Sequence, residues 1–338
     1  MINIDSFIEQ IPKIELHMHI EGSLEPELMF RLAQTNKVDI PFKTVDDVRA
    51  AYKFTDLQSF LDIYYQGMNV LRTENDFYDL TMAYLTRAHN QNIVHTEIFF
   101  DPQGHTDRGI AFGTVINGIH RALDDGQKEF GISSKLIMCF LRHLDEQSAL
   151  KTLEAAKPYR HLITGVGLDS SENGHPPSKF QNVFSEAGKQ GYKRVAHAGE
   201  EGPAQYVWEA LSLLNVDRID HGNRSMEDDN LIDMLSDMGI GLTICPLSNT
   251  ALCNVSDMKF HPLKNMLDRG VKVMVNSDDP AYFGGYMTEN FKAVTNALNL
   301  DKDDIIKLSE NAINVSFLSP YEKIQKHIAL QDFIRSFE

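Results

Sequence analysis

Short runs of apolar residues recur along the chain, and each run ends in polar residues. The runs are rich in β-branched or large side chains. Such runs are typical of strands that are buried on both faces, as in a parallel sheet. The predicted strands are Ile14–His19, Ile93–Phe100, Lys135–Leu141, Leu162–Leu168, Arg194–His197, Arg218–His221, Gly241–Cys245 and Val271–Asn276.

Helical patterns lie between these strands, with apolar residues three and four positions apart. One of them begins with Pro26, and proline is favoured at the first position of a helix. The predicted helices are Pro26–Gln34, Phe77–Asn90, Ala111–Leu123, Ser178–Lys189, Ala204–Leu214, Asn230–Met238 and Leu263–Arg269, and a helical pattern continues after Leu300.

The alternation of strand and helix predicts an α/β fold of the (β/α)8 TIM barrel type. The alternative is an open doubly wound sheet, but no G-x-G-x-x-G motif follows the first strand. The long gap between the first two strands must hold more than one helix, and long insertions commonly form lids. We therefore expect one barrel domain over residues 1–338. A helical insertion over roughly residues 40–90 would form a lid over the barrel mouth.

Polar residues cluster at the predicted carboxyl ends of the strands, where barrel enzymes place their catalytic groups. The first strand carries His17 and His19. Side chains alternate along a strand, so both histidines point the same way, into the barrel. Two imidazoles on one face can bind a divalent ion, although such a pair is also found as hydrogen-bonded core histidines.

A third histidine and an acid lie at other strand ends. His197 ends the fifth predicted strand, and Asp278 follows the eighth. Three imidazoles and a carboxylate suit zinc, and iron or manganese less discriminately. An isolated Asp278 would fit a helix N-cap equally well. Four such residues at strand ends together favour a metal site.

A metal with an open position lowers the pKa of its bound water toward neutrality, and a nearby group must then handle protons. Glu200 lies three residues after His197 in the stretch HAGEEG, where glycine lets the backbone turn sharply. Glu200 is a candidate general acid or base, with a first-turn helix acid as the alternative. His221 would orient the hydroxide or be a hydrogen-bonded core histidine.

Composition restricts the class of partner. The formal net charge is -16, with 48 acidic residues against 32 basic ones, and so acidic a surface repels nucleic acid polymers and anionic membranes. No run reaches the roughly 18 apolar residues that span a bilayer, and the N-terminus has no signal-peptide pattern. We therefore expect a cytoplasmic protein. Without a C-x-x-C pair, three cysteines predict neither a disulfide framework nor a cysteine zinc site. We expect buried core thiols at Cys139, Cys245 and Cys253.

Five short polar motifs follow one another along the chain in a characteristic order. They are His17-x-His19, Gly167-Leu168-Asp169, His197-Ala198-Gly199-Glu200, Asp220-His221-Gly222 and Ser277-Asp278-Asp279-Pro280. Their order resembles that of the adenosine and adenine deaminase branch of the amidohydrolase barrels. The resemblance covers residue 12 to about residue 320.

This resemblance implies a hydrolase of purine salvage that removes an amino group from a purine. It implies one zinc ion per chain, with iron as the alternative, held by His17, His19, His197 and Asp278. Glu200 would protonate the purine at N1, and His221 would orient the zinc-activated hydroxide that attacks C6. Asp279 would hydrogen-bond N7, and the backbone N–H near Gly167 would bind N3.

Two stretches bear on the substrate. Adenosine deaminases of this family usually carry aspartate two residues after the histidine pair, where it meets the ribose 5′-hydroxyl. Here that residue is Glu21, whose extra methylene would intrude on ribose. The stretch GLDSSENGHPPSKF, from Gly167 to Phe180, looks like bacterial members that act on the free base. The resemblance therefore implies adenine as the substrate, with hypoxanthine and ammonia as products.

Other substrates and other classes of protein share these motifs. A deaminase of adenosine or of an N6-substituted adenine would keep the metal ligands, and so would a barrel that only binds purines. A binding barrel needs no acid at Glu200, so an enzyme is favoured. Ser170, Ser171 and Glu172 would close the ribose side of the pocket or form a polar turn. We expect a small-molecule purine as the partner, and a homo-oligomer is compatible with the sequence.

Overall fold

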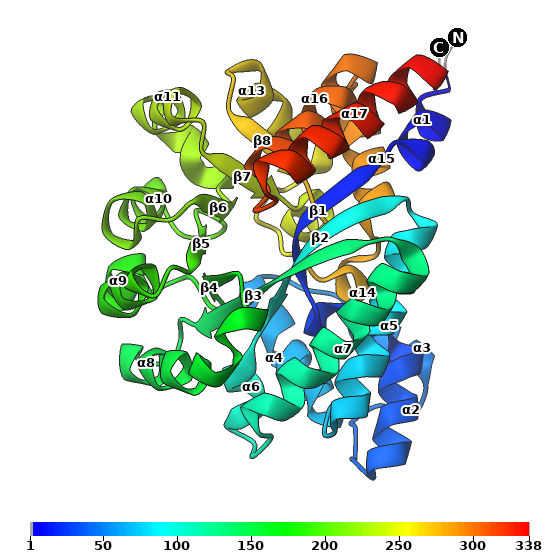
Figure 1. Ribbon diagram of the computed structural model, residues 1–338, viewed down its shortest axis with the longest axis vertical. Coiled ribbons are helices and arrows are strands. Elements are labelled where there is room, and N and C mark those ends of the chain that lie inside the picture. The colour runs from blue at the N-terminus through cyan, green and yellow to red at the C-terminus, as the bar shows by residue number, and fades with distance from the viewer. Residues whose placement is uncertain (1–2, 338) are drawn as a thin grey trace.

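The computed structural model describes residues 3–337, in which eight strands form one sheet in the order β1 to β8. Each strand pairs in parallel with the next. Helices surround the strands on the outside (Figure 1). The prediction of a (β/α)8 barrel is confirmed. The strands are β1 Lys13–His19, β2 Ile93–Phe100, β3 Ser133–Leu141, β4 Gly165–Asp169, β5 Lys193–Ala198, β6 Arg218–His221, β7 Gly241–Ile244 and β8 Lys272–Val275.

The fourth strand begins later than the sequence predicts. The prediction starts it at Leu162, but Lys157–Leu162 form a 3-10 helix and β4 begins at Gly165. Pro158 lies in the first turn of this 3-10 helix, where its fixed φ favours helical geometry. Pairing with β3 begins after the turn, with Ile137 opposite Gly165.

A helix lies at each predicted position. These helices are α2 (Pro26–Asn36), α5 (Glu74–Asn90), α7 (Phe112–Phe130), α9 (Gln181–Lys189), α10 (Ala204–Glu209), α11 (Asp229–Met238), α13 (Leu263–Asp268), α16 (Lys302–Val315) and α17 (Pro320–Phe337). However, α7 extends to Phe130, beyond its predicted end at Leu123, and α10 ends at Glu209, after which Ala210–Leu214 form a π-helix. The pattern did not single out α1 (Ile4–Gln10), α3 (Val45–Ala51), α4 (Leu57–Gly67), α6 (Pro102–Thr106), α8 (Glu146–Ala155), α12 (Pro246–Ala251), α14 (Pro280–Phe283) or α15 (Met287–Leu298). Among residues 3–337, none of these helices has both the length and the apolar character needed to cross a bilayer.

Four helices, α2 to α5, fill the chain between β1 and β2, and α3 to α5 lie where the sequence predicts a helical insertion. The helix α4 begins with a capping box, in which the Asp56 carboxylate accepts the Ser59 N–H at 2.8 Å. Its apolar face carries Phe60 and Tyr64, which are both buried. This face meets the mouth of the barrel, so the insertion forms part of the wall of a cavity there.

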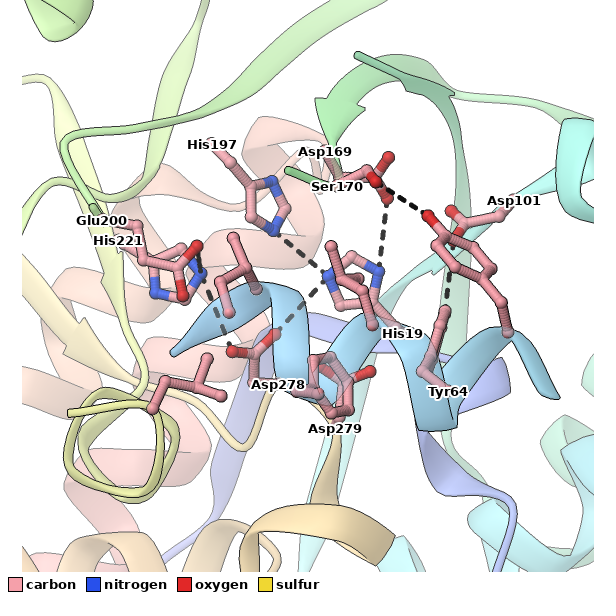
Figure 2. A pocket seen from close by; sticks show the side chains of 15 residues that line it. His19, Tyr64, Asp101, Asp169, Ser170, His197, Glu200, His221, Asp278 and Asp279 are labelled. Carbon is pink, nitrogen blue, oxygen red and sulfur yellow. Dashed lines mark hydrogen bonds and ion pairs between the residues drawn. The ribbon is translucent and has the colours of Figure 1, made fainter. Parts of the chain in front are cut away.

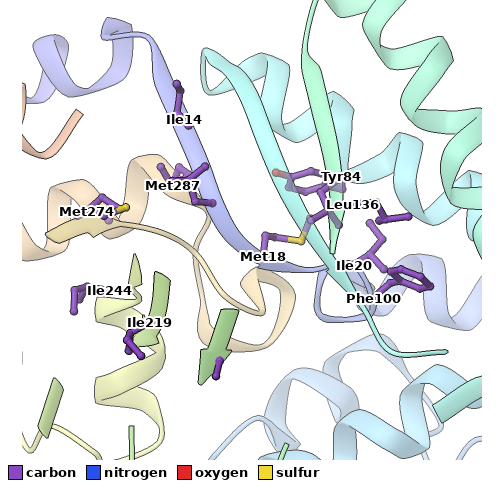
Figure 3. Close-up of a cluster of buried hydrophobic side chains, with 14 of the residues drawn as sticks. Ile14, Met18, Ile20, Tyr84, Phe100, Leu136, Ile219, Ile244, Met274 and Met287 are labelled. Atoms are coloured by element: carbon purple, nitrogen blue, oxygen red, sulfur yellow. The ribbon is translucent and has the colours of Figure 1, made fainter. Parts of the chain in front are cut away.

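Side chains along β1 alternate between the helices and the barrel interior. Ile14 and Met18 join the large hydrophobic core between strands and helices (Figure 3). His17, at an alternate position, turns inward, and its ring centroid lies 4.9 Å from that of Phe99. Phe99 belongs to a smaller apolar cluster with Ile137, Cys139 and Val195. The alternation expected for the first strand is therefore observed.

The barrel closes between β8 and β1 through a seam of a few specific hydrogen bonds. The Asn276 side-chain oxygen accepts the Leu16 N–H at 2.7 Å. Beyond β8, Asp278 forms an isolated parallel bridge with Met18. Its N–H donates to the His17 carbonyl at 3.1 Å, and its carbonyl accepts the His19 N–H at 2.9 Å. The seam therefore aligns both histidines of β1 with Asp278.

Replacing Asn276 with alanine should destabilise the barrel, because the buried Leu16 N–H loses its acceptor. We expect a loss of about 1 to 3 kcal/mol in the free energy of unfolding. Urea denaturation followed by circular dichroism measures this loss. The matched control is Asn265→Ala, at an exposed position on α13. Equal stability of the two variants would show that the Asn276 bond does not hold the seam.

Candidate active site

A cavity opens at the carboxyl ends of the strands, beneath α4, on the side where barrel enzymes carry their sites. Its walls combine strand-end acids and histidines with apolar side chains from the insertion (Figure 2). The lining residues are His19, Leu57, Phe60, Leu61, Tyr64, Tyr65, Asp101, Asp169, Ser170, His197, Glu200, His221, Leu252, Asp278 and Asp279.

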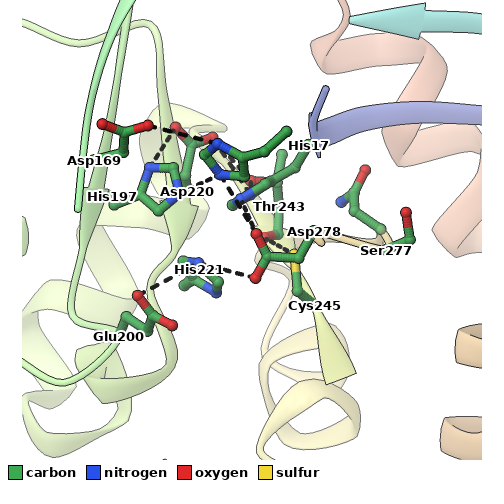
Figure 4. Close-up of polar contacts among 12 residues, drawn as sticks. His17, Asp169, His197, Glu200, Asp220, His221, Thr243, Cys245, Ser277 and Asp278 are labelled. Atoms are coloured by element: carbon green, nitrogen blue, oxygen red, sulfur yellow. Dashed lines mark hydrogen bonds and ion pairs between the residues drawn. The ribbon is translucent and has the colours of Figure 1, made fainter. Parts of the chain in front are cut away.

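Predicted metal ligands converge at the floor of this cavity (Figures 2 and 4). His17 Nε2 lies 3.1 Å from Asp278 Oδ1, and His19 Nε2 lies 3.5 Å from the same oxygen. His19 Nε2 is 3.1 Å from His197 Nε2. In a tetrahedral zinc site with bonds of about 2.0 to 2.1 Å, neighbouring donor atoms lie about 3.3 Å apart. These separations suit one shared ion.

The chemistry of the donors also fits a metal. His17 Nε2 is buried and has no hydrogen-bond partner, and such atoms are rare unless something else binds them. Donor atoms of His17, His197, His221 and Asp278 all lie within 4.8 Å of one another, whereas His19 forms a second group with Asp278 and Asp279. His221, predicted to be catalytic, therefore lies as close to this centre as the predicted ligands.

Buried polar groups behind the histidine rings contact their Nδ1 atoms and orient them. His17 Nδ1 lies 2.8 Å from the Thr243 hydroxyl, which donates to Asp220 Oδ1 at 2.9 Å. The other oxygen of Asp220 lies 3.6 Å from His197 Nδ1 (Figure 4). Outer carboxylates of this kind fix the orientation of metal-binding histidines. Asp220 belongs to the motif Asp220-His221-Gly222, and its place at the end of a strand is the sequence signal for this role.

Burial keeps the imidazoles neutral, as metal binding requires. It lowers the pKa of His19 and of His221 to about 3 in each case, and that of His197 well below its usual value. Burial alone would raise the pKa of Asp278, but the nearby His17 and His221 outweigh it and bring the pKa well below the usual range. Three imidazoles of the cluster are therefore kept in the neutral form, beside a carboxylate whose pKa is lowered.

The predicted acid, Glu200, reaches the cavity from the loop after β5 (Figure 2). Gly199 before it has a φ of 72°, a left-handed conformation that glycine adopts without strain. Glu200 Oε2 lies 3.6 Å from His221 Nε2. Burial and the charge of Asp278 raise the pKa of Glu200 well above its usual value, and they do the same for Asp279. Both carboxyl groups therefore hold their protons more strongly than an exposed carboxyl does.

The next residue, Glu201, binds the insertion. Its Oε1 accepts the N–H of Leu57, the first residue of α4, at 3.0 Å. A second link joins the Tyr65 and Ser170 hydroxyls at 2.8 Å. Ser170 has a φ of 75°, and a left-handed backbone in a residue other than glycine is typical of functional sites. The cavity wall from α4 is therefore attached to loops after both β4 and β5.

Two predicted substrate contacts, Glu21 and the backbone N–H near Gly167, stay predictions, and neither residue is among those that line the cavity. Gly167 is the middle residue of β4, and a side chain there would meet Cys139 Sγ at 2.6 Å. The cavity is lined instead by Asp169 and Ser170 further along. Glu21 turns away from the cavity and accepts hydrogen bonds from His105 Nε2 at 2.7 Å and the Asp101 N–H at 3.2 Å.

The structure adds two acids that the sequence analysis did not single out as site residues. Asp101, after β2, and Asp169, at the end of β4, both line the cavity. Their positions at strand ends were the available signal. The prediction for one cysteine is wrong: Cys139 and Cys245 are buried, but Cys253 is exposed, because it lies in a surface turn after α12.

Replacing Asp278 with asparagine should weaken metal retention, because a neutral amide is a poorer ligand than a carboxylate. We expect at least about tenfold weaker binding, as for changes around other metal sites. Elemental analysis after dialysis against a chelator measures the metal bound per chain. Asp229→Asn, at an exposed position on α11, is the control. Equal metal content in both variants would remove Asp278 from the ligand set.

Known proteins resemble this chain over most of its length. The adenine deaminases of Sphingopyxis alaskensis and Caulobacter vibrioides are 61% and 58% identical to it over 327 residues, which is 97% of this chain and 96% and 95% of theirs. The solved adenine deaminase of Arthrobacter aurescens is 47% identical, with a TM-score of 0.95 over 96% of this chain and 99% of its own.

A solved amidohydrolase of Burkholderia ambifaria with bound zinc has a TM-score of 0.90 at 25% identity, over 98% of this chain and 94% of its own. The metal dependence implied by the donor set is consistent with these relatives. A family model described as adenosine deaminase matches residues 12–331. With that match and with relatives of this identity, the chain belongs to the adenosine deaminase family.

Proposed function

We propose that this chain is a metal-dependent adenine deaminase, which hydrolyses adenine to hypoxanthine and ammonia. The relatives at 56% to 61% identity that carry this name support the reaction. The observation that carries the proposal is the position of Glu200. This buried carboxyl, whose pKa is raised well above its usual value, lies in the same cavity as the metal donors, where a binding protein would need no acid.

The roles of the side chains follow from their protonation and position. When bound, the metal supplies a water whose pKa is lowered toward neutrality. Glu200 donates its proton to N1 of the purine, which makes C6 more electrophilic. Asp279, whose pKa is raised in the same way, donates a hydrogen bond to N7. His221 Nε2, 3.6 Å from Glu200 and 3.7 Å from Asp278 Oδ2, helps to orient the attacking water.

The end of the cavity away from Glu200 favours a free base over a nucleoside. Asp101 Oδ1 and Asp169 Oδ1 are buried there without a hydrogen-bond partner. Unpaired buried oxygens are costly, so they call for a donor on the ligand. Adenine offers N9–H, which a nucleoside replaces with a sugar. Tyr64 donates to Asp101 Oδ2 at 3.2 Å and occupies part of the same end (Figure 2).

We therefore propose that Asp101 and Asp169, and not Glu21, exclude ribose. Glu21 contributes indirectly, because it accepts a hydrogen bond from the Asp101 N–H. Deamination of adenosine or of an N6-substituted adenine is the alternative function. The metal donors and Glu200 would serve those reactions equally well.

Further assignments complete this proposal. We assign zinc, with His17, His19, His197 and Asp278 as its ligands, and iron as the alternative. The insertion around α4 acts as a lid on a single barrel domain, predicted over residues 1–338, of which residues 1, 2 and 338 lie outside the described residues. We also propose that the protein is cytoplasmic and does not bind nucleic acid. A homo-oligomer is compatible with this proposal.

Adenine should be the preferred substrate in a panel with adenosine, N6-methyladenine and N6-isopentenyladenine. The physical reason is the pair of carboxyl groups that lie where a sugar would have to fit. Ammonia release, measured on protein of known metal content, gives kcat/KM for each compound. We expect adenine to exceed adenosine by at least about 100-fold, a usual size for discrimination by a fitted polar site. A preference for adenosine would contradict the proposal.

Replacing Glu200 with glutamine should abolish most of the activity while metal stays bound, because an amide cannot donate the proton to N1. We expect kcat to fall by at least about 100-fold, the usual contribution of a general acid. The control is Glu154→Gln, at an exposed position on α8. Near-normal kcat in Glu200→Gln at full metal content would mean that another group supplies the proton.

A further inference from the structure

One buried carboxylate outside the cavity binds the backbone of the loop that carries Glu200. Glu172 lies in the loop after β4, and its side chain is completely buried. Its Oε1 accepts the Gly199 N–H at 2.7 Å. Its Oε2 accepts the N–H groups of Glu200, Glu201 and Gly202 at 3.0, 2.8 and 2.8 Å. Four consecutive backbone donors therefore converge on one side chain.

A carboxylate bound in this way holds a backbone segment firmly. Consecutive N–H groups pointing to one side form a concave anion site, and here the protein supplies the anion itself. Bonds between N–H groups and a charged acceptor are among the stronger ones in proteins. Both oxygens of Glu172 are used, so this side chain has no free acceptor facing the cavity. The prediction that Glu172 closes the ribose side is therefore replaced by a different role.

The neighbouring residues are fitted to this contact. A Cβ at Gly202 would lie 2.8 Å from Glu172 Oε1 and 2.5 Å from the Tyr206 ring, so only glycine fits. The buried Arg142 guanidinium attracts the Glu172 charge, and its Nη1 donates to the His197 carbonyl at 2.6 Å. The contact therefore joins the loops after β4 and β5 close to a predicted metal ligand.

We infer that Glu172 is a positioning residue for the deamination: its carboxylate fixes the backbone from Gly199 to Gly202 so that Glu200 points into the cavity. This inference rests on the proposed function, in which Glu200 is the proton donor. Glu172 does not touch the substrate and acts only through its neighbour. Removing it should therefore impair the proton-transfer step and spare the binding of adenine and of the metal.

The first test is Glu172→Gln, whose amide group turns N–H donors toward the backbone N–H groups. We expect kcat for adenine to fall by at least about tenfold while KM changes by less than about threefold. Metal content should stay that of the wild type. Glu146→Gln is the matched control, because Glu146 also accepts backbone N–H groups, from Asn182 and Val183, but at the start of α9. This control should keep its kcat.

A double-mutant cycle separates positioning from general stability. If Glu172 acts through Glu200, then adding Glu172→Gln to Glu200→Gln should cost less than about threefold more in kcat. If Glu172→Gln lowers kcat by the same factor in the Glu200→Gln background as in the wild type, the two effects are independent and the inference is overturned. If Glu200→Gln has no measurable turnover, Glu172→Gln alone decides. A raised KM or a lower metal content, with an unchanged kcat, then overturns the inference.

A conservative variant covers the case in which Glu172→Gln does not fold. Glu172→Asp keeps the charge but is one methylene shorter, so it cannot reach all four N–H groups. We expect an intermediate kcat with unchanged KM, and a wild-type kcat would overturn the inference. Adenine turnover by the wild type is a separate measurement: its absence overturns the proposed function, whereas turnover with independent effects in the cycle overturns only the role of Glu172.

Discussion

The closure of the barrel between β8 and β1 is the constraint on which the active site depends. Backbone hydrogen bonds join Asp278 to His17 and His19 across this seam. The same three residues point donor atoms at one another in the cavity floor. The ring of strands must therefore be complete before the metal site exists, and the geometry of the site is a property of the whole barrel.

The buried charges of the site control one another. Burial raises the pKa of Glu200 and of Asp279, and the charge on Asp278 raises both further. Neighbouring carboxyl groups cannot all ionise easily in a buried site. One arrangement thus combines a carboxylate whose pKa is lowered, Asp278, with two carboxyl groups that hold their protons more strongly than usual. The three carboxyl groups therefore reach different pKa values within one shared environment.

The strands and the convergence of histidines and Asp278 at the barrel mouth could be predicted because they obey local rules. The run Ile93–Phe100 begins and ends with large apolar residues and forms β2 with those bounds, and the inward direction of His17 follows from alternation along β1. Residues whose roles depend on distant partners could not be assigned. Glu172 binds N–H groups 27 to 30 residues away, and Glu21 binds one 80 residues away, so neither local pattern contains the partner.

The adjacent residues Glu200 and Glu201 link the cavity to the first turn of α4. Glu200 is the acid inside the cavity, and Glu201 holds the first N–H of α4 from outside it. A movement of α4 that breaks this bond would act on the backbone next to Glu200, one peptide unit away. The position of α4 and the backbone of the proposed proton donor are therefore mechanically coupled.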